Sequence, residues 1–266
     1  MVKIFTLKVL IFSHFLAFLF TPFLSFTQNN SVLEPAGNKY HKEDTVSILI
    51  IPYNPRYYLS DSDRQIAEAS NKSVLAIRET FRMSLDNSLM KQFNAKFLTH
   101  SVLSDTTVQA EIDLKRIYNE QVLNYEQSPS YKKGKKSGRK KSEKKERGIG
   151  IDNSSIATDN SFMDDQFMNV TFSNDELLSE LAARYENDYF LFLNQFEIRI
   201  DYTDCLDLSK KIYNRKLKIH YSIYDKNGRY LTGDYVKIVF PSNTNNINEI
   251  ISRNFYQIAR QLAEVL

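Results

Sequence analysis

The clearest pattern of hydrophobic and polar positions lies in the last third of the chain. Apolar side chains from Leu217 to Ile223 alternate with polar ones, which is the period of a strand with one buried face. The sequence Asp225-Lys226-Asn227-Gly228 follows and predicts a tight turn, because Asn-Gly favours positive φ angles. Residues 230–240 then predict the returning antiparallel strand, and residues 189–202 predict a long strand ahead of the pair.

Two groups of side chains on this hairpin bear on its surroundings and its function. The polar residues of the alternating strand are expected to face solvent: Lys216, Lys218, His220 and Ser222. Tyrosines gather across the hairpin and either stabilise the sheet by cross-strand pairing or form a face that binds a sugar or peptide: Tyr221, Tyr224, Tyr230 and Tyr235.

The first half of the chain mixes one buried strand with helices. Residues 47–53 (SILIIPY) form a short continuous apolar run that ends at a proline, as expected for a central strand. A polar loop is predicted over residues 54–64, and a short extended piece over 97–103. One helix is predicted from an apolar stripe at steps of three or four, with Asn71 and Ser73 as capping residues: Val74, Ile77, Phe81, Leu85 and Leu89. A second amphipathic helix is predicted from Val108, Ile112, Ile117, Tyr118, Val122 and Tyr125.

Three further elements complete the expected fold. A strand is predicted at 168–172, and Ser173-Asn174-Asp175-Glu176 predicts a capping box that starts a helix to about Tyr185. A final helix is expected to open at Asn245 or Asn248. This order of elements predicts an α/β or α+β fold, with a mixed, partly antiparallel sheet covered by helices. We expect a single domain over residues 45–266, interrupted by a disordered insertion at about 126–165.

Charge is concentrated in that insertion. The run from Lys132 to Arg147 holds ten Lys or Arg and two Glu, so it contributes +8 to a net charge of +3 and leaves about −5 for the rest. The run is either a solvated linker or an electrostatic contact to anionic lipid or wall polymer. Nucleic acid is an unlikely partner, because Tyr131 is the only aromatic residue beside it. Its candidate contact residues are Lys132, Lys133, Lys135, Lys136, Arg139, Lys140 and Lys141.

The start of the chain predicts export. Lys3 and Lys8 precede an uncharged apolar run over residues 9–26, the layout of a signal peptide, with cleavage expected before Gln28. The alternative is an uncleaved membrane anchor at 9–26. Residues 28–44 are expected to be a flexible segment, and the protein is expected to be periplasmic or secreted.

Lipid attachment after cleavage needs a cysteine at the new N-terminus, whereas Cys205 is the only cysteine. Cys205 is read as a small core residue or a free thiol.

No catalytic signature is found, and no cofactor, metal site or catalytic residue is predicted. Only Gly37, Gly228 and Gly233 lie outside the signal and the insertion, which excludes a glycine-rich phosphate loop. The loop over residues 54–64 follows the presumed central strand, where ligands of open α/β sheets tend to bind. It is a structural loop or a binding surface in which arginines hold an anion or aspartates a cation. Its candidate binding residues are Arg56, Tyr57, Tyr58, Asp61, Asp63 and Arg64.

The order of elements resembles a known group of envelope domains. The export signal, the SILIIPY strand before a long helix, the strand LFLNQFEIRID, the Asn-Gly hairpin and the C-terminal helix are similar to the periplasmic α/β domain of TolB, LpoB and CsgG. The chain is also similar to uncharacterised exported proteins of Bacteroidetes. The resemblance implies an envelope accessory or assembly protein that binds another protein without chemistry of its own. The alternatives are an envelope enzyme acting on a glycan or peptide near residues 54–64, and a structural protein tethered through residues 132–147.

Overall fold

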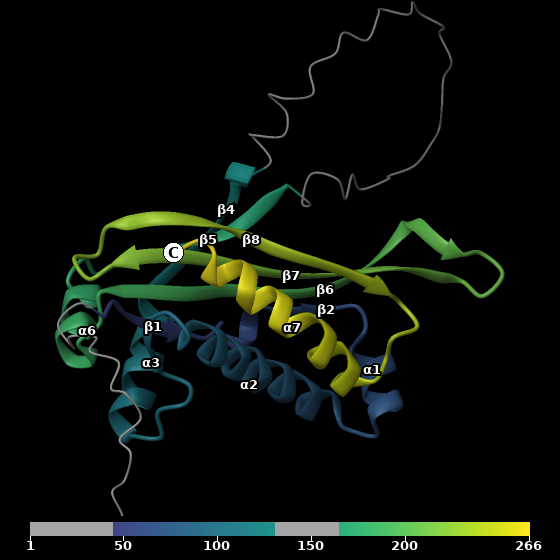
Figure 1. The fold of residues 1–266 in the computed structure, drawn as a ribbon, viewed down its shortest axis with the longest axis horizontal. Helices are drawn as coiled ribbons and strands as arrows, with labels where there is room; N and C mark the ends of the chain where they lie inside the picture. Colours follow the sequence, from purple (N-terminus) through teal and green to yellow (C-terminus); the bar gives the residue numbers. More distant parts are fainter. Residues whose placement is uncertain (1–44, 131–164) are drawn as a thin grey trace, which may run out of the picture. The chain divides into compact units, whose positions relative to one another are not determined.

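A six-stranded mixed sheet forms the centre of the fold (Figure 1). The structure is a computed structural model that describes residues 45–130 and 165–266. The signal, the segment 28–44 and the basic run 132–147 lie outside the described residues. The strand order is β3-β1-β6-β7-β8, with β1 parallel to both of its neighbours and the last three strands antiparallel. These strands are β1 (Ser47–Ile51), β3 (Leu98–Ser101), β6 (Tyr189–Asp207), β7 (Ile212–Asp225) and β8 (Tyr230–Pro241).

The segment that follows β1 departs from the predicted polar loop. It contains a 3-10 turn, η1 (Pro55–Tyr57), and a sixth strand, β2 (Tyr58–Ser60), which pairs in parallel with β6 beyond the end of β1. The reason is the burial of Tyr58, whose ring stacks on Phe196 with centroids 5.0 Å apart. Because the loop is mostly polar, its composition did not predict that Tyr58 is buried.

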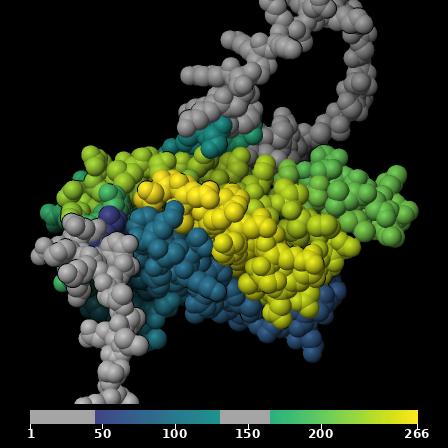
Figure 2. Space-filling model, in the orientation of Figure 1, coloured from purple at the N-terminus to yellow at the C-terminus, as the bar shows by residue number. Residues whose placement is uncertain are grey.

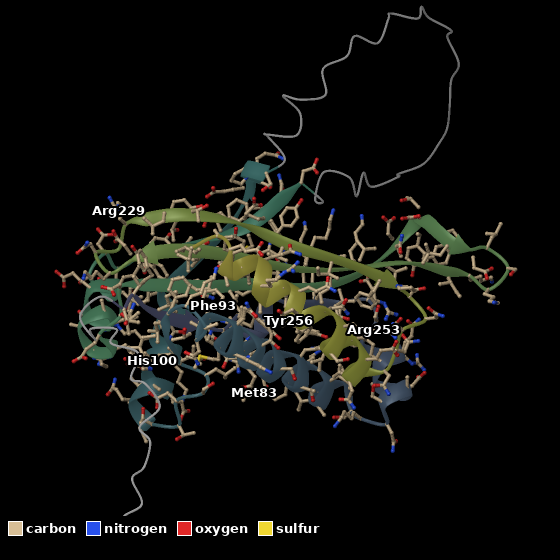
Figure 3. All side chains as sticks on the ribbon, viewed as in Figure 1. Met83, Phe93, His100, Arg229, Arg253 and Tyr256 are labelled. Atoms are coloured by element: carbon tan, nitrogen blue, oxygen red, sulfur yellow. The ribbon has the colours of Figure 1, made fainter. Side chains whose placement is uncertain are left out.

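Three helices cover one face of the sheet (Figures 1 and 2). They are α1 (Asp63–Ser70), α2 (Val74–Phe93) and α7 (Ile247–Ala263). The predicted stripe of α2 is buried from Ile77 to Leu89, and Ser73 caps the helix by accepting the Ala76 N–H at 3.1 Å. Asn246 caps α7, one residue after the predicted Asn245 and two before the predicted Asn248. Arg253 and Tyr256 point outward from α7 (Figure 3), and its opposite side packs into the main core.

The second face of the sheet carries α3 (Val108–Glu120), α6 (Leu177–Tyr185) and the two-stranded sheet of β4 (Gln121–Gln127) and β5 (Gln166–Phe172). The helix predicted to reach Tyr125 therefore ends at Glu120, and Val122 and Tyr125 lie in a strand because β5 supplies the pairing edge. The predicted capping box is also wrong. Ser173 donates its hydroxyl to the Glu120 carbonyl at 3.2 Å, and α6 begins after Glu176 with no side-chain cap.

The two faces belong to one compact unit, which confirms the predicted single domain with a mixed sheet between helices. Gly228 has a φ of +77° in the β7–β8 turn, as the Asn-Gly pair predicts. The sheet thus buries an apolar layer on each side, one beneath α2 and α7 and one beneath α3 and α6.

A buried carboxyl group ties α2 to the edge strand β3. Asp86 accepts the Ser101 hydroxyl at 2.6 Å and the Ser104 hydroxyl at 2.7 Å. Burial raises the pKa of Asp86, and these hydroxyls and Arg82 only partly offset it. The native state therefore binds the Asp86 proton more tightly than the unfolded chain, so this group's contribution to stability falls as the pH rises above about 4.

Asp86→Asn is expected to raise the free energy of unfolding at pH 7 by roughly 0.5–1.5 kcal/mol. The amide keeps a partner for each serine hydroxyl but carries no charge to desolvate. The gain should shrink as the pH falls towards 4, because the carboxyl of the native protein is then increasingly protonated. Urea unfolding of both proteins at pH 7 and pH 4 measures this, and a less stable variant at pH 7 would contradict it.

Candidate functional site

Two of the six residues predicted near the end of β1 meet in the structure. Tyr58 donates its hydroxyl to Asp63 Oδ1 at 2.5 Å, and Arg78 Nε lies 2.8 Å from Asp63 Oδ2. The Arg78 guanidinium also lies over the Tyr58 ring, 5.2 Å from its centroid. Burial and the neighbouring Asp63 carboxylate raise the pKa of Tyr58 far above its usual value. This trio joins β2, α1 and α2, so each of its polar groups already has a partner within the fold.

The other four predicted residues do not converge on it. Arg56 is exposed and Tyr57 half-buried. Asp61 accepts the Ile200 N–H at 3.4 Å, and Arg64 pairs with Glu68 one turn along α1. Within residues 45–130 and 165–266 no group of three or more His, Cys, Asp or Glu side chains could hold a metal ion.

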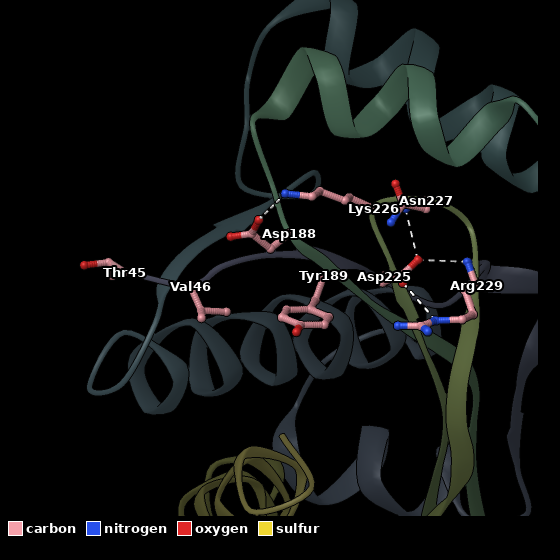
Figure 4. A pocket seen from close by; sticks show the side chains of 8 residues that line it. All are labelled: Thr45, Val46, Asp188, Tyr189, Asp225, Lys226, Asn227 and Arg229. Carbon is pink, nitrogen blue, oxygen red and sulfur yellow. Dashed lines mark hydrogen bonds and ion pairs between the residues drawn. The ribbon is translucent and has the colours of Figure 1, made fainter. Parts of the chain in front are cut away.

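An open hollow of about 360 Å³ lies at the end of the sheet where β7 turns into β8 (Figure 4). Its charged side chains pair with each other: Lys226 lies 3.0 Å from Asp188, and Arg229 lies 3.1 Å from Asp225. The Asp225 carboxylate also accepts the Asn227 and Arg229 backbone N–H groups, as a turn-forming aspartate does. These charges shape the turn and leave no convergent set of unpaired groups in the hollow.

The polar face of β7 is buried, contrary to the prediction that it faces solvent. His220 and Ser222 are fully buried and Lys218 nearly so, because β5 lies across this face. Only Lys216 of the four predicted residues is partly accessible, and it pairs with Asp201 at 2.9 Å. Alternation correctly separates the two faces of β7, but it cannot show that a second small sheet covers the polar one.

Side chains take the place of a neighbouring strand along one edge of β5. The Met168 N–H donates to His220 Nδ1 at 2.7 Å, and the Met168 carbonyl accepts from Asn194 at 2.8 Å. The Val170 carbonyl accepts the Tyr224 hydroxyl at 2.5 Å. Two weaker contacts belong to the same edge: Lys218 Nζ to the Gln166 carbonyl at 3.2 Å, and the Val170 N–H, which also donates to Asn169 Oδ1 at 3.0 Å, to Ser222 Oγ at 3.4 Å. We call these five contacts the polar ladder.

His220 and Glu197 form a buried acid–base pair beneath the ladder. The second ring nitrogen, Nε2, lies 3.4 Å from Glu197 Oε1 but is not aligned for a hydrogen bond. Burial lowers the pKa of His220, although the Glu197 carboxylate partly opposes this. Burial alone would raise the pKa of Glu197, but His220 and the nearby cations lower it overall. The imidazole is fully buried, so His220 is not accessible from the surface.

The predicted tyrosine group splits between the two faces of the sheet. Tyr221 lies in the main core, while Tyr224 lies in the second core and contacts Tyr230 edge-on at 5.4 Å. Tyr235 packs beside His220 with centroids 6.2 Å apart. The four rings therefore support the sheet and its cover rather than forming one binding face.

The most exposed apolar surface of the sheet lies on residues 202–213, which comprise the end of β6, the turn and the start of β7 and which we call the distal arm. In Figure 1 it extends past α1 and α7. Tyr202, Leu206 and Leu208 are 67%, 50% and 79% exposed. Beyond Ile198, no strand of the described chain pairs with the outer edge of β6. The distal arm thus offers apolar side chains together with an unpaired strand edge.

Polar groups of the distal arm are engaged locally. Asp204 accepts from the Asn214 amide, and Asp207 accepts the Ser209 hydroxyl at 2.7 Å. At its base, hydrogen bonds from Thr203 and the nearby Lys216 lower the pKa of Asp201 to about 2. Cys205 lies on the arm as an exposed free thiol, which corrects its reading as a core residue. Exposure of this hairpin could not be read from the sequence, since its alternation is irregular after Asp201.

Comparisons with known proteins identify no family. No family model matches the chain, and none of the curated proteins matches it. Among solved structures it is similar to the crystal structure of lipoprotein GNA1162 from Neisseria meningitidis, with 11% sequence identity and a TM-score of 0.29. The alignment covers 82% of this chain and 99% of that chain. A match at this level does not establish a shared fold or role, and the resemblance to TolB, LpoB and CsgG stays a prediction.

None of the helices in residues 45–130 and 165–266 is long and apolar enough to span a bilayer.

Proposed function

We propose that the chain is an exported accessory protein of the cell envelope that binds another protein and performs no chemistry of its own. The distal arm carries this proposal. Its three exposed apolar side chains stand beside an unpaired strand edge, and both features are typical of protein-binding surfaces. The partner that fits is a protein with an apolar cleft and a free strand edge of its own.

Local pairing of the arm's charges favours that choice of partner. Asp204 and Asp207 already hold groups of the arm itself, so a partner does not need complementary charge to dock there. The contact would then come from burial of Tyr202, Leu206 and Leu208, worth about 1.5–3 kcal/mol for each large aliphatic side chain fully removed from water. Residues at the centre of an interface contribute most of the binding energy.

The two alternatives have less structural support. For an envelope enzyme near residues 54–64, only Tyr58 and Asp63 of the six candidate residues meet, and they are engaged with each other. For a tether through residues 132–147, the basic run lies outside the described residues, and its contact with anionic lipid or wall polymer stays a prediction.

A photo-crosslinker placed at position 208 is expected to give one discrete protein adduct in the envelope of the producing cell. The same crosslinker at position 256, exposed on α7 and far from the arm in sequence, should give no such adduct. Leu206→Ser combined with Tyr202→Ser should reduce the adduct at 208 at least tenfold, while the unfolding temperature stays within a few degrees because these side chains are exposed. Equal adducts from positions 208 and 256, or none from 208, would contradict the proposal.

A further inference from the structure

The β4–β5 hairpin is held on the central sheet by the polar ladder as well as by apolar contacts. One edge of β5 pairs with β4 along its full length. The other edge meets side chains of β6 and β7, and the shortest contact to a β5 backbone N–H is the 2.7 Å bond from Met168 to His220 Nδ1. Ser222 also accepts the Val170 N–H, at 3.4 Å. His220 is thus the ladder member whose ability to accept depends on its protonation state.

The direction of the Met168 bond determines the state of the imidazole ring. Because Nδ1 accepts a hydrogen bond, it carries no proton, and the single proton of the neutral ring lies on Nε2. A second proton would have to bind at Nδ1. It would then face the Met168 N–H, donor against donor, so a charged His220 and this contact exclude each other.

The surroundings of His220 contain one strong opposing charge. Glu197 from β6 faces Nε2 at 3.4 Å and favours a charged ring. Lys218 from β7 disfavours it, while Asp234 from β8 favours it weakly. Complete burial outweighs these effects and keeps the pKa of His220 below its usual value. The remaining titratable groups against the ring are two tyrosines, Tyr125 of β4 and Tyr235 of β8.

We propose that His220 is a proton-sensitive clasp, which holds the β4–β5 hairpin on the sheet when neutral and releases it as the pH falls. In the released state the ring meets water and can take a proton near pH 6.5. In the docked state the ring cannot take that proton without losing the hydrogen bond from the Met168 N–H. Acid therefore favours release: the released state binds more protons, and the free energy of opening decreases as the pH drops below about 6.5.

Amide hydrogen exchange of the full chain tests the clasp. After correction for intrinsic exchange rates, the opening constant at Met168 is expected to rise up to about tenfold between pH 7.5 and pH 5.5, as follows for a released ring that takes its proton near pH 6.5. Amides of β1 should not change, since the β1 backbone pairs with β3 and β6 and takes no part in the ladder. His100, the other histidine in the described residues, is exposed on β3 and does not contribute.

Two variants distinguish the effect of His220 protonation from a general weakening of the polar ladder. His220→Gln keeps an acceptor for Met168 but cannot be protonated in this range, so its opening constant should be independent of pH. Ser222→Ala removes a ladder acceptor that does not titrate, so it should raise opening equally at pH 7.5 and pH 5.5. The proposal is overturned if His220→Gln keeps the wild-type pH profile, or if Met168 and β1 lose protection together.

A measurement on the wild-type protein covers the case in which His220→Gln does not fold. Nitrogen chemical shifts of the His220 ring at pH 7 should show the neutral tautomer with its proton on Nε2. A ring that is charged at pH 7, or that carries its proton on Nδ1, would contradict the proposal, because in neither form can Nδ1 accept a hydrogen bond from the Met168 N–H.

Discussion

Replacement of Arg215 by methionine is expected to lower the free energy of unfolding by about 3 kcal/mol. Arg215 of β7 is fully buried, and its guanidinium holds the connection from β8 to α7. Nη1 donates to the Thr244 carbonyl at 2.9 Å, and Nη2 donates to the Ser242 carbonyl at 2.8 Å. Methionine fills much of the same volume but leaves these partly buried carbonyls without their donor.

Neutral acceptors surround this cation. Nη2 also donates to Gln65 of α1 and to Asn245, each at 3.0 Å, and the Phe240 ring lies 5.6 Å from the guanidinium carbon. Burial lowers the pKa of Arg215 to about 10, which still leaves it protonated at neutral pH. Arg215 therefore links β7, α1 and the start of α7 through several bonds that no other side chain can make at once.

Urea unfolding at pH 7 measures this loss, with Lys237→Met as the matched control. Lys237 is an exposed cation on the neighbouring strand β8, so its replacement should change stability by less than about 0.5 kcal/mol. Arg215→Lys should fall between the two, because an ammonium group donates fewer and less directed bonds. Equal midpoints for Arg215→Met and Lys237→Met would show that the acceptors are hydrated or rearranged.

Hydrophobic periodicity predicted most of the elements that carry the sheet and its main core. The apolar stripe of α2 and the alternation of β7 each predict a buried face. On that face an apolar side chain recurs at nearly every helical turn of α2 and at every second residue of β7. The same alternation places Arg215 on the inward face, two residues before Leu217. That inward arginine was a readable sign of a buried polar contact.

Features that depend on long-range contacts were not readable in the same way. Tyr125 follows a helical pattern, yet it lies in β4 because β5, more than 40 residues later in the chain, supplies the pairing partner. His220 lies on a polar strand face, and only the position of β5 across that face buries it. The distal arm is a continuation of two predicted strands, and its exposure follows from where α1 and α7 end.

The candidate site shows the same limit. Loop composition indicated Tyr58 and Asp63 as candidate binding residues, whereas in the structure they contact each other and Arg78 and so join β2, α1 and α2. The apolar residues of the distal arm were not among the candidates, because a sequence pattern cannot tell an inward face from an uncovered one. Exposure must be known before either segment can be assigned a role.

Phe196→Ala is expected to lower the free energy of unfolding by about 3–5 kcal/mol. Phe196 lies at the middle of β6, fully buried, and its ring contacts aromatic rings from the β1–β2 segment, α2 and α7. These neighbours, with their centroid distances, are Tyr58 at 5.0 Å, Tyr53 at 5.5 Å, Phe81 at 5.5 Å and Phe255 at 6.3 Å. Removing the ring leaves a cavity that these four large side chains cannot fill without leaving their own contacts.

Tyr256→Ala on α7 is the matched control, since it deletes an aromatic ring that is 59% exposed. This variant should lower the free energy of unfolding by less than about 1 kcal/mol. The difference between the two variants then measures the effect of burying an aromatic ring, since both lose one. Phe196→Ala should also release Tyr58, whose ring stacks on it, and so raise amide exchange in β2 more than in β3. A loss under 1 kcal/mol for Phe196→Ala would mean that β2 does not pack on β6 through this ring.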